Sequence, residues 1–319
     1  MANLSQSQID QLYLVMVICG GISFAFSFIV LLAHIFLRKS QRRFNDPVLW
    51  LSFCCLMMPV FTLKIGNWGT EWCVGEAAGN QFFNVASFLW VTCIAHQLYQ
   101  VLCCDLPIVS NKYLPAYHLL CWGIPLITVA LLLFFGHFET ETEDVGWCWI
   151  ESGPWRFTLF YIPMFILMLI NCVAYVFIIW TVYGKYKRAL DVQGRGPESQ
   201  NFAKQTIVWG LKASLYPVVF LGVRTGSTIN RIYEIFGSNP NFGLKVIHVL
   251  CSGLQGFFYA LVYIYNERVL ARLRRSCEPA AHGFESDYSY PYASSNYSEE
   301  SEFDDSFPNE GQDQYELRT

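Results

Sequence analysis

The sequence predicts an all-α membrane protein with a bundle of seven transmembrane helices, and both its composition and its pattern of apolar residues indicate this class. Hydrophobic residues make up 54% of the chain and charged residues 14%, which is less charge than a soluble protein carries. The apolar residues fall into long runs, each near the roughly 20 residues that a helix needs to cross a bilayer. We predict transmembrane helices at residues 12–37, 48–65, 77–104, 114–135, 157–183, 206–227 and 244–265. The third and sixth are the least apolar, so we expect them to face neighbouring helices more than lipid.

The basic residues predict the orientation of this bundle. Most of them lie in alternate loops and after the last helix, namely Arg38, Lys39, Arg42, Arg43, Lys112, Lys185, Lys187, Arg188, Arg195, Lys204, Arg268, Arg272, Arg274 and Arg275. The opposite side holds Arg156, Arg231 and Lys245, with Lys64 and Arg224 at helix ends. Because cytoplasmic loops carry an excess of Lys and Arg, we expect the N-terminus outside and the C-terminus inside. The first apolar run is too long for a signal-peptide core and has no basic residues before it.

This orientation divides the chain into four parts. Residues 1–11 form a short extracellular N-terminus, and residues 12–265 form the bundle. In residues 266–277 Val269, Leu270 and Leu273 fall on one side of a helix and Arg268, Arg272 and Arg275 on the other, which predicts a short amphipathic helix on the cytoplasmic membrane surface. Residues 278–319 are rich in Ser, Tyr, Asp and Glu, which predicts a disordered acidic tail in the cytoplasm. No internal repeat is apparent.

Two cysteines, Cys73 and Cys148, lie on the outer side in this topology, whereas the others lie inside helices or near the cytosol. Because outer loops mature in an oxidising compartment, we predict a Cys73–Cys148 disulfide that ties the long loop to the top of the third helix. Trp147 and Trp149 flank Cys148. They either form walls of a binding mouth or anchor the loop at headgroup depth.

Four segments carry a resemblance to a known family. They are "SGLQGFFYALVYIYNERV" at 252–269, "KASLYPVVFLG" at 212–222, "SFLWVTCIAHQLY" at 87–99 and "GWCWI" at 146–150. Together they resemble G-protein-coupled receptors of the cyclic-AMP-receptor-like group (class E), with secretin-like features, and a related group of vertebrate orphan receptors. The chain departs from other receptor classes. It has no large cysteine-rich N-terminal domain, no Asp-Arg-Tyr after the third helix, and no lysine deep in the seventh helix for retinal.

The resemblance implies a plasma-membrane receptor that binds an extracellular ligand and activates heterotrimeric G proteins, with no catalytic activity, metal or cofactor of its own. Two alternatives stay open, an intramembrane zinc hydrolase and a transporter. A hydrolase needs converging ligands, and the histidines of the predicted helices fall at different depths, at His34, His96, His118 and His248. A transporter would show an inverted repeat or paired broken helices, which the sequence lacks. Zinc content and substrate flux would discriminate these alternatives.

Candidate pocket residues gather near the outer ends of the helices. Four cations, Lys64, Arg156, Arg224 and Lys245, are expected at the outer rim, with Trp68, Trp72, Trp90 and Tyr161 as aromatic walls. Several cations around one mouth favour a small anionic ligand such as a cyclic nucleotide. Alternatively, each cation reaches lipid headgroups or pairs with the acidic loop at 139–144.

Six residues are candidates for a conformational switch, namely His96, Tyr99, Lys212, Pro217, Gln255 and Gly256. Pro217 removes a backbone hydrogen bond in the sixth helix and predicts a hinge or a static kink. Gln255 needs a partner on a neighbouring helix because an unpaired amide in hydrocarbon is costly, so we expect it to couple the sixth and seventh helices. His96, Tyr99 and Lys212 either contribute to a polar lock at the inner end or pack and snorkel without such a role.

The inner surface carries the expected contacts with cellular partners. Candidates for the G-protein face are Arg42, Arg43, Lys185, Lys187 and Arg188. Cys277 is a candidate for lipidation, and Asn3 lies in an acceptor sequence for glycosylation on the outside. The acidic tail suits kinases and, once phosphorylated, a basic partner such as an arrestin. The remaining partners expected are the lipid bilayer and the ligand, with no nucleic-acid polymer.

Overall fold

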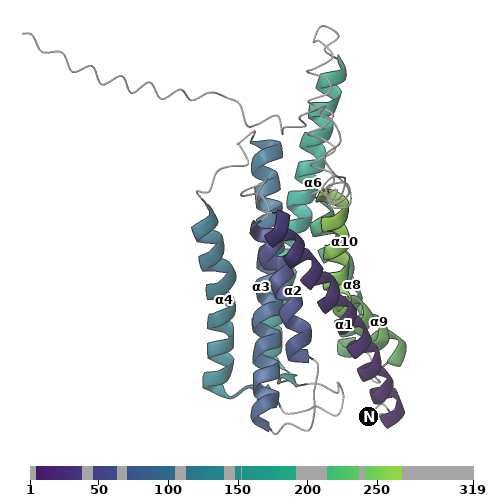
Figure 1. Cartoon of the computed structure of the whole chain (residues 1–319). Helices are drawn as coiled ribbons and strands as arrows, with labels where there is room; N and C mark the ends of the chain where they lie inside the picture. The colour runs from purple at the N-terminus through teal and green to yellow at the C-terminus, as the bar shows by residue number, and fades with distance from the viewer. Residues whose placement is uncertain are drawn as a thin grey trace, which may run out of the picture. The chain divides into compact units, whose positions relative to one another are not determined.

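The computed structural model describes residues 5–37, 46–62, 70–104, 113–139, 148–151, 153–191, 214–236 and 241–267 (Figure 1). The helices are α1 (Gln6–Leu37), α2 (Asp46–Thr62), α3 (Thr70–Cys103), α4 (Leu114–Phe135), α5 (Pro154–Arg156), α6 (Ile162–Asp191), α8 (Leu215–Phe236), α9 (Phe242–Gly253) and α10 (Gln255–Glu267). A π-helical turn, η2 (Phe157–Tyr161), joins α5 to α6. A two-stranded hairpin, β1 (Phe138–Glu139) and β2 (Trp149–Ile150), lies between α4 and α5 in the chain.

The described part of the chain is nearly all helical, in agreement with the predicted all-α class. Four of its helices are long and apolar enough to cross a membrane, at Gln6–Phe36, Trp72–Cys103, Leu114–Phe135 and Pro154–Lys185. The pair α9 and α10 makes a fifth if it is taken as one span bent by 44°, and α2 is apolar but shorter. A described helix overlaps each of the seven predicted runs. That all seven cross the bilayer, with the N-terminus outside, stays a prediction.

The predicted end of the sixth helix was wrong. We expected it to end at residue 227, but α8 continues to Phe236. Arg224 therefore lies inside the helix rather than at its end. The polar residues after position 223 are not an exposed terminus, because Ser227 and Asn230 are buried while Thr225 and Ile229 are exposed. They form the polar face of an amphipathic helix, and this face packs into the bundle.

The seventh predicted helix is broken. The chain runs as α9 to Gly253 and resumes as α10 at Gln255, with Leu254 between them and a bend of 44°. Gly256 follows the break, and its backbone N–H donates a hydrogen bond to Ser23 Oγ of α1 at 2.8 Å. The break thus turns a backbone donor of the last helix toward the first helix.

Helix α3 lies at the centre of the bundle and packs on α2, α4, α6 and α8. In its most apolar 18-residue window 67% of residues are buried, against 17–33% in the other long helices, so the expectation that it faces its neighbours is met. Gln81 Nε2 donates to the Leu159 carbonyl of η2 at 3.0 Å. Asn171 Nδ2 of α6 donates to Thr92 Oγ1 at 2.8 Å. These side-chain hydrogen bonds tie α3 to the start and the middle of the fifth predicted span.

Gly256 permits the close approach of α10 to α1 and α2. A methyl group at this position would overlap the hydroxyl oxygens of Ser23 and Ser27 and would come within 3.0 Å of Cys55 Cβ. Close contact through small residues is how helices pack where lipid gives them no hydrophobic drive to associate.

We expect Gly256→Ala to lower the free energy of unfolding by about 1–3 kcal/mol, because overpacking forces the facing helices apart. The measurement is the unfolding midpoint of the purified protein in lipid nanodiscs. Gly222→Ala is the matched control, since nothing lies within 4 Å of a methyl group there. Equal midpoints for the two variants would show that α1 and α10 do not depend on this contact.

Candidate ligand-binding site

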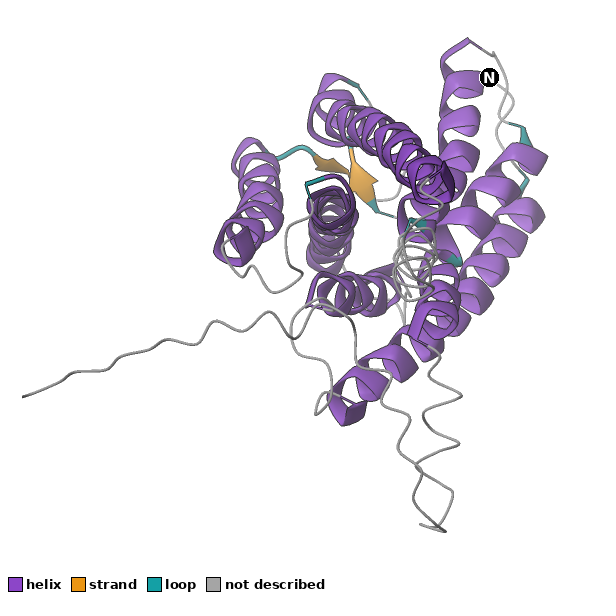
Figure 2. Cartoon of the chain, turned by 90° about the horizontal axis from the view of Figure 1, so that it is seen from above, coloured by secondary structure: helices purple, strands orange, loops and turns teal. Residues whose placement is uncertain are grey.

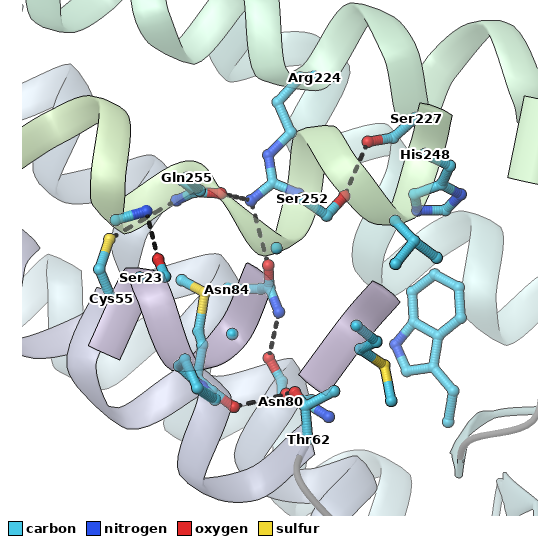
Figure 3. A pocket seen from close by; sticks show the side chains of 18 of the residues that line it. Ser23, Cys55, Thr62, Asn80, Asn84, Arg224, Ser227, His248, Ser252 and Gln255 are labelled. Carbon is cyan, nitrogen blue, oxygen red and sulfur yellow. Dashed lines mark hydrogen bonds between the residues drawn. The ribbon is translucent and has the colours of Figure 1, made fainter. Parts of the chain in front are cut away.

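A cavity of about 140 Å³ lies within the bundle, lined by helices from both ends of the chain. Its polar lining consists of Ser23, Thr62, Asn80, Asn84, Arg224, Ser227, His248, Ser252 and Gln255 (Figure 3). Its apolar lining includes Met16, Met58, Pro59, Phe160, Met164 and Val249. A concave site with an apolar wall and a few convergent polar groups is typical of small-molecule binding.

Arg224 is the charged residue that dominates this lining. It is 3% exposed, and its Nη2 donates to Asn84 Oδ1 of α3 at 3.1 Å and to Gln255 Oε1 of α10. Its guanidinium carbon lies 4.3 Å from the centre of the Phe88 ring. None of the carboxylates in the described ranges pairs with it, and its Nε has no hydrogen-bond partner there. A buried guanidinium held by neutral amides and a ring retains a capacity to bind an anion.

Gln255 connects four helices around this arginine. Its oxygen accepts from Arg224 of α8, and its Nε2 donates to Ser87 Oγ of α3 at 3.3 Å and approaches Cys55 Sγ of α2 at 3.9 Å. The break before α10 makes Gln255 the first residue of that helix. Figure 3 shows its amide between Arg224 and the α2 side of the cavity. Any movement of α8 that draws Arg224 away therefore leaves the Gln255 oxygen without its donor.

An amide wall from α3 forms the next part of the cavity. Asn84 Nδ2 donates to the Asn80 carbonyl at 2.8 Å, and Thr62 Oγ1 of α2 lies 2.8 Å from Asn80 Oδ1. Asn80 and Asn84 are one helical turn apart, so both side chains lie on the face of α3 that lines the cavity. Amides offer donors and acceptors together, which suits the hydroxyl and ring-nitrogen groups of a polar ligand.

The opposite wall belongs to α8 and α9. Ser227 Oγ and Ser252 Oγ lie 3.2 Å apart and link the two helices, as Figure 3 shows. His248 Nδ1 lies 3.4 Å from Asn230 Nδ2. Helices α8 and α9, which are adjacent in sequence, thus meet through polar contacts inside the bundle. These contacts lie on the side where α8 carries Arg224.

A loop hairpin contributes one residue to the cavity, Trp149 of β2. The strands pair antiparallel, with Phe138 opposite Ile150 and Glu139 opposite Trp149. A disulfide joins Cys148 to Cys73 of α3, with the two Cα atoms 5.3 Å apart. Seen along the helices, the hairpin lies among them and not beside them (Figure 2). Strand and disulfide together position the indole against the bundle.

Several predicted pocket residues do meet at this cavity. Arg224, Tyr161 and Trp149 line it, and so do Gln255 and Gly256, which we had placed among the switch candidates. Tyr161 ends the π-helical turn η2, a distortion that is frequent at functional sites.

Other predicted pocket residues lie elsewhere. Arg156 and Lys245 are buried but do not line the cavity, and Trp72 is exposed at 43%. The positions of Lys64, Trp68 and Trp147 lie outside the described residues.

The assignment of Trp90 to the pocket was wrong. Its side chain is fully buried and packs between α2 and α4, with ring centres 6.3 Å from Trp50, 5.2 Å from His118 and 5.8 Å from Trp122. A tryptophan buries more apolar area than other side chains, so it fills the core of the bundle. The placement of Arg224 at the outer rim was likewise wrong, because α8 continues for three turns beyond it.

The inner switch candidates contact other helices than α8. His96 Nδ1 lies 2.7 Å from the Tyr117 hydroxyl of α4, and Tyr99 packs on Phe177 of α6 at 5.7 Å between ring centres. Pro217 lies in the first described turn of α8, after an undescribed stretch.

The remaining candidates divide between one helix end and undescribed parts of the chain. Lys185, Lys187 and Arg188 lie in the last turns of α6. The positions outside the described residues are Asn3, Arg42, Arg43, Lys212 and Cys277, with most of the predicted amphipathic helix and the whole tail.

Sequence reasoning missed the amide wall and the histidine of the cavity. Asn80 and Asn84 stand four residues apart in a predicted transmembrane run, and Ser87 follows on the same side. Polar residues at helical spacing within an apolar run indicate a face that points into the protein, so this signal was available. His248 was considered as a metal ligand and not as a wall of a cavity.

The comparisons with known proteins agree with the resemblance. The model of the slime mold cyclic AMP receptor family matches residues 5–277. The chain is 28% identical to cyclic AMP receptor-like protein A of Dictyostelium discoideum over 74% of its own length and 60% of that protein. It is also 28% identical to G-protein coupled receptor 1 of Arabidopsis thaliana, over 81% of this chain and 79% of the relative.

A human protein is similar at the same level. The chain is 26% identical to G-protein coupled receptor 157 of Homo sapiens over 66% of each protein. The match to cyclic AMP receptor-like protein A leaves two fifths of that relative uncovered. The family model covers most of the chain and both ends of the helical region. The chain therefore belongs to the slime mold cyclic AMP receptor family, a group of receptors of the G-protein-coupled type.

Proposed function

We propose that this protein is a G-protein-coupled receptor whose cavity binds a small extracellular anion, such as a cyclic nucleotide, and which activates heterotrimeric G proteins. The observation that carries the proposal is Arg224, a buried guanidinium in a cavity with no described carboxylate beside it. A ligand phosphate or carboxylate would supply the missing counter-charge through charge-assisted hydrogen bonds.

The rest of the lining supports a ligand that also has polar and flat apolar parts. Asn80 and Asn84 offer amide groups beside Arg224, and Met16, Met58 and Met164 offer soft apolar surface. Methionine sulfur contacts aromatic rings favourably, so a planar ring fits this wall. Two relatives are named cyclic AMP receptor 4 and cyclic AMP receptor 1, and a cyclic nucleotide combines an anionic phosphate with a polar, planar ring.

The proposed topology has seven spans in the plasma membrane with the N-terminus outside. It places the disulfide loop and Trp149 on the extracellular side, and the basic end of α6 on the cytoplasmic side. Kinases and an arrestin would then act on the acidic cytoplasmic tail. The charge asymmetry between the two sides supports this orientation.

The cytoplasmic end of α6 is the proposed G-protein contact. Lys185 and Lys187 are followed by Arg188 in the last turns of a helix of 30 residues, longer than a bilayer requires. We expect the triple change of these residues to Ala to lower basal G-protein activation about tenfold, because each removes a cation from the docking face. The measurement is energy transfer between G-protein subunits in cells, across the four Gα families, at matched surface expression.

A double change of Gln6 and Ser7 to Ala, in the exposed first turn of α1, serves as the control and should leave the signal unchanged. Basal signal in one Gα family that the α6 variant loses supports the receptor function and identifies the pathway. Equal signals for the wild type and the α6 variant would contradict this docking face. Zinc content and substrate flux of the purified protein would test the alternatives of a hydrolase and a transporter.

A further inference from the structure

We infer that Trp149 is a lid on the Arg224 cavity and that Arg231 of α8 is the latch that holds it closed. Among the described lining residues, Trp149 is the one that comes from the loop hairpin, while the others come from helices. It is therefore the part of the described lining that a loop contributes. The inference rests on the proposed receptor function for its biological meaning, but its test does not depend on signalling.

Two guanidinium groups contact the indole of Trp149. The guanidinium carbon of Arg156 lies 4.8 Å from the ring centre and that of Arg231 lies 5.3 Å from it. Both distances are within the range of a cation–π interaction. Arg156 is itself fixed, because its Nε donates to the Ile150 carbonyl at 2.8 Å in the same hairpin. Arg156 thus stiffens the loop, and Arg231 connects the loop to α8.

The position of Arg231 on α8 relates the latch to the ligand site. Arg231 follows Arg224 by seven residues, which is two helical turns or about 10 Å along the axis, so both side chains leave the same face of the helix. One helix therefore carries the anion-binding group inside the cavity and the cation that contacts the lid above it. A rotation or tilt of α8 changes both contacts together.

The base of the lid is fixed, which leaves the indole itself as the moving part. Cys148, the residue before Trp149, is bonded to α3, and Ile150 after it is fully buried. The indole packs edge-on against Phe160 and Tyr161 of η2, at 5.1 and 6.0 Å between ring centres. A side-chain rotation of Trp149 about this fixed backbone would open the cavity and break the Arg231 contact.

The test measures how fast a solute reaches the bottom of the cavity. Ser252 lines the cavity on α9, about 15 Å along the helix from its first residue, so Ser252→Cys is a reporter below the lid. A methanethiosulfonate reagent with a sulfonate group forms a mixed disulfide with this thiol and releases methanesulfinate. The rate is measured in lipid nanodiscs and counted over that of the same variant without the reporter, because the free cysteine Cys55 also lines the cavity.

We expect Arg231→Met to raise the modification rate of the reporter about threefold, since it removes one cation–π contact while keeping a side chain of similar length. Trp149→Ala should raise it further, and the combination should equal Trp149→Ala alone, because the latch acts through the lid. Arg188→Met makes the same substitution at the far end of α6 and should leave the modification rate of the reporter unchanged. A second reporter, Ser7→Cys, lies on the exposed first turn of α1 and should react equally in all variants.

Equal rates at Ser252→Cys in the wild type, Arg231→Met and Trp149→Ala would overturn the lid. A rise for Trp149→Ala with none for Arg231→Met would overturn the latch. A rise at both reporters would mean general loosening of the bundle and would also count against the inference. The readout is thiol chemistry and does not depend on signalling. A G-protein assay without signal would therefore count against the proposed function and leave the lid and latch result unaffected.

Discussion

Replacing Arg224 by Met should raise the half-maximal concentration of the activating anion about 100-fold at unchanged surface expression. The side chain is buried, donates to Asn84 and Gln255, and is the lining residue with a permanent positive charge. A hydrogen bond to a charged group contributes about 1.5–3 kcal/mol, and each 1.4 kcal/mol is a tenfold change in affinity. The measurement is a dose–response curve of G-protein activation, with cyclic AMP as the first probe.

The conservative variant separates binding from folding. Arg224→Lys keeps the charge but loses the planar guanidinium whose Nη2 donates to both Asn84 and Gln255, so its response should fall between the wild type and Arg224→Met. Asn84→Leu is a companion change in the same cluster that removes no charge, and we expect a smaller loss. If Arg224→Lys, Arg224→Met and the wild type give the same dose–response curve, the anion does not contact this guanidinium.

Removing the disulfide should have the largest effect on stability. Cys148→Ser releases the hairpin loop from α3 by removing a bond between residues 75 apart in the sequence, and loss of a native disulfide costs about 2–5 kcal/mol. It also frees the strand that carries Trp149. We expect surface expression and the unfolding midpoint to fall in parallel.

Two comparisons with other cysteine variants test whether the loss of stability comes from this bond. Cys73→Ser and the double variant should match Cys148→Ser, because all three lack the same bond. Cys172→Ser, at a free and partly exposed cysteine of α6, should behave as the wild type. Wild-type stability in the double variant would contradict the bond between these two cysteines.

The sequence predicted the helical class well because the membrane imposes a simple rule. Apolar runs of about 20 residues form helices wherever the backbone must satisfy its own hydrogen bonds. Each of the seven runs overlaps a described helix for this reason. The rule gives no information on where a helix bends, so the break at Leu254 was missed.

Helix ends with polar residues were harder to predict. Arg224, Ser227 and Asn230 read as the approach to an outer loop, because hydropathy averages all sides of a helix. In the structure they are buried along one face of α8 and point into the bundle. The polar residues of this segment recur at every third position, which is close to the spacing of one helix face. Applying this periodicity would have extended the predicted helix and placed Arg224 in the interior.

For the aromatic residues, residue type did not distinguish a core position from a cavity position. Trp90 and Trp149 are equally suited to a pocket wall by residue type, yet one fills the core beside Trp50 and the other lines the cavity. Their difference arises from contacts between distant segments, which a single sequence does not reveal. The loop cysteine beside Trp149 was the useful signal, since it fixes the neighbouring residue against α3.

The central claim is that Arg224 is the anion-binding group of a receptor cavity, and ligand-induced stabilisation tests it most directly. The measurement is the unfolding midpoint of the wild type and Arg224→Met in nanodiscs, with a panel of cyclic nucleotides, small carboxylates, inorganic phosphate and amines. A ligand that binds the folded state alone raises the midpoint in proportion to its occupancy. We predict that an anion of this panel stabilises the wild type and not the variant. Stabilisation by an amine instead, or no difference between the two proteins with any anion, would contradict the account.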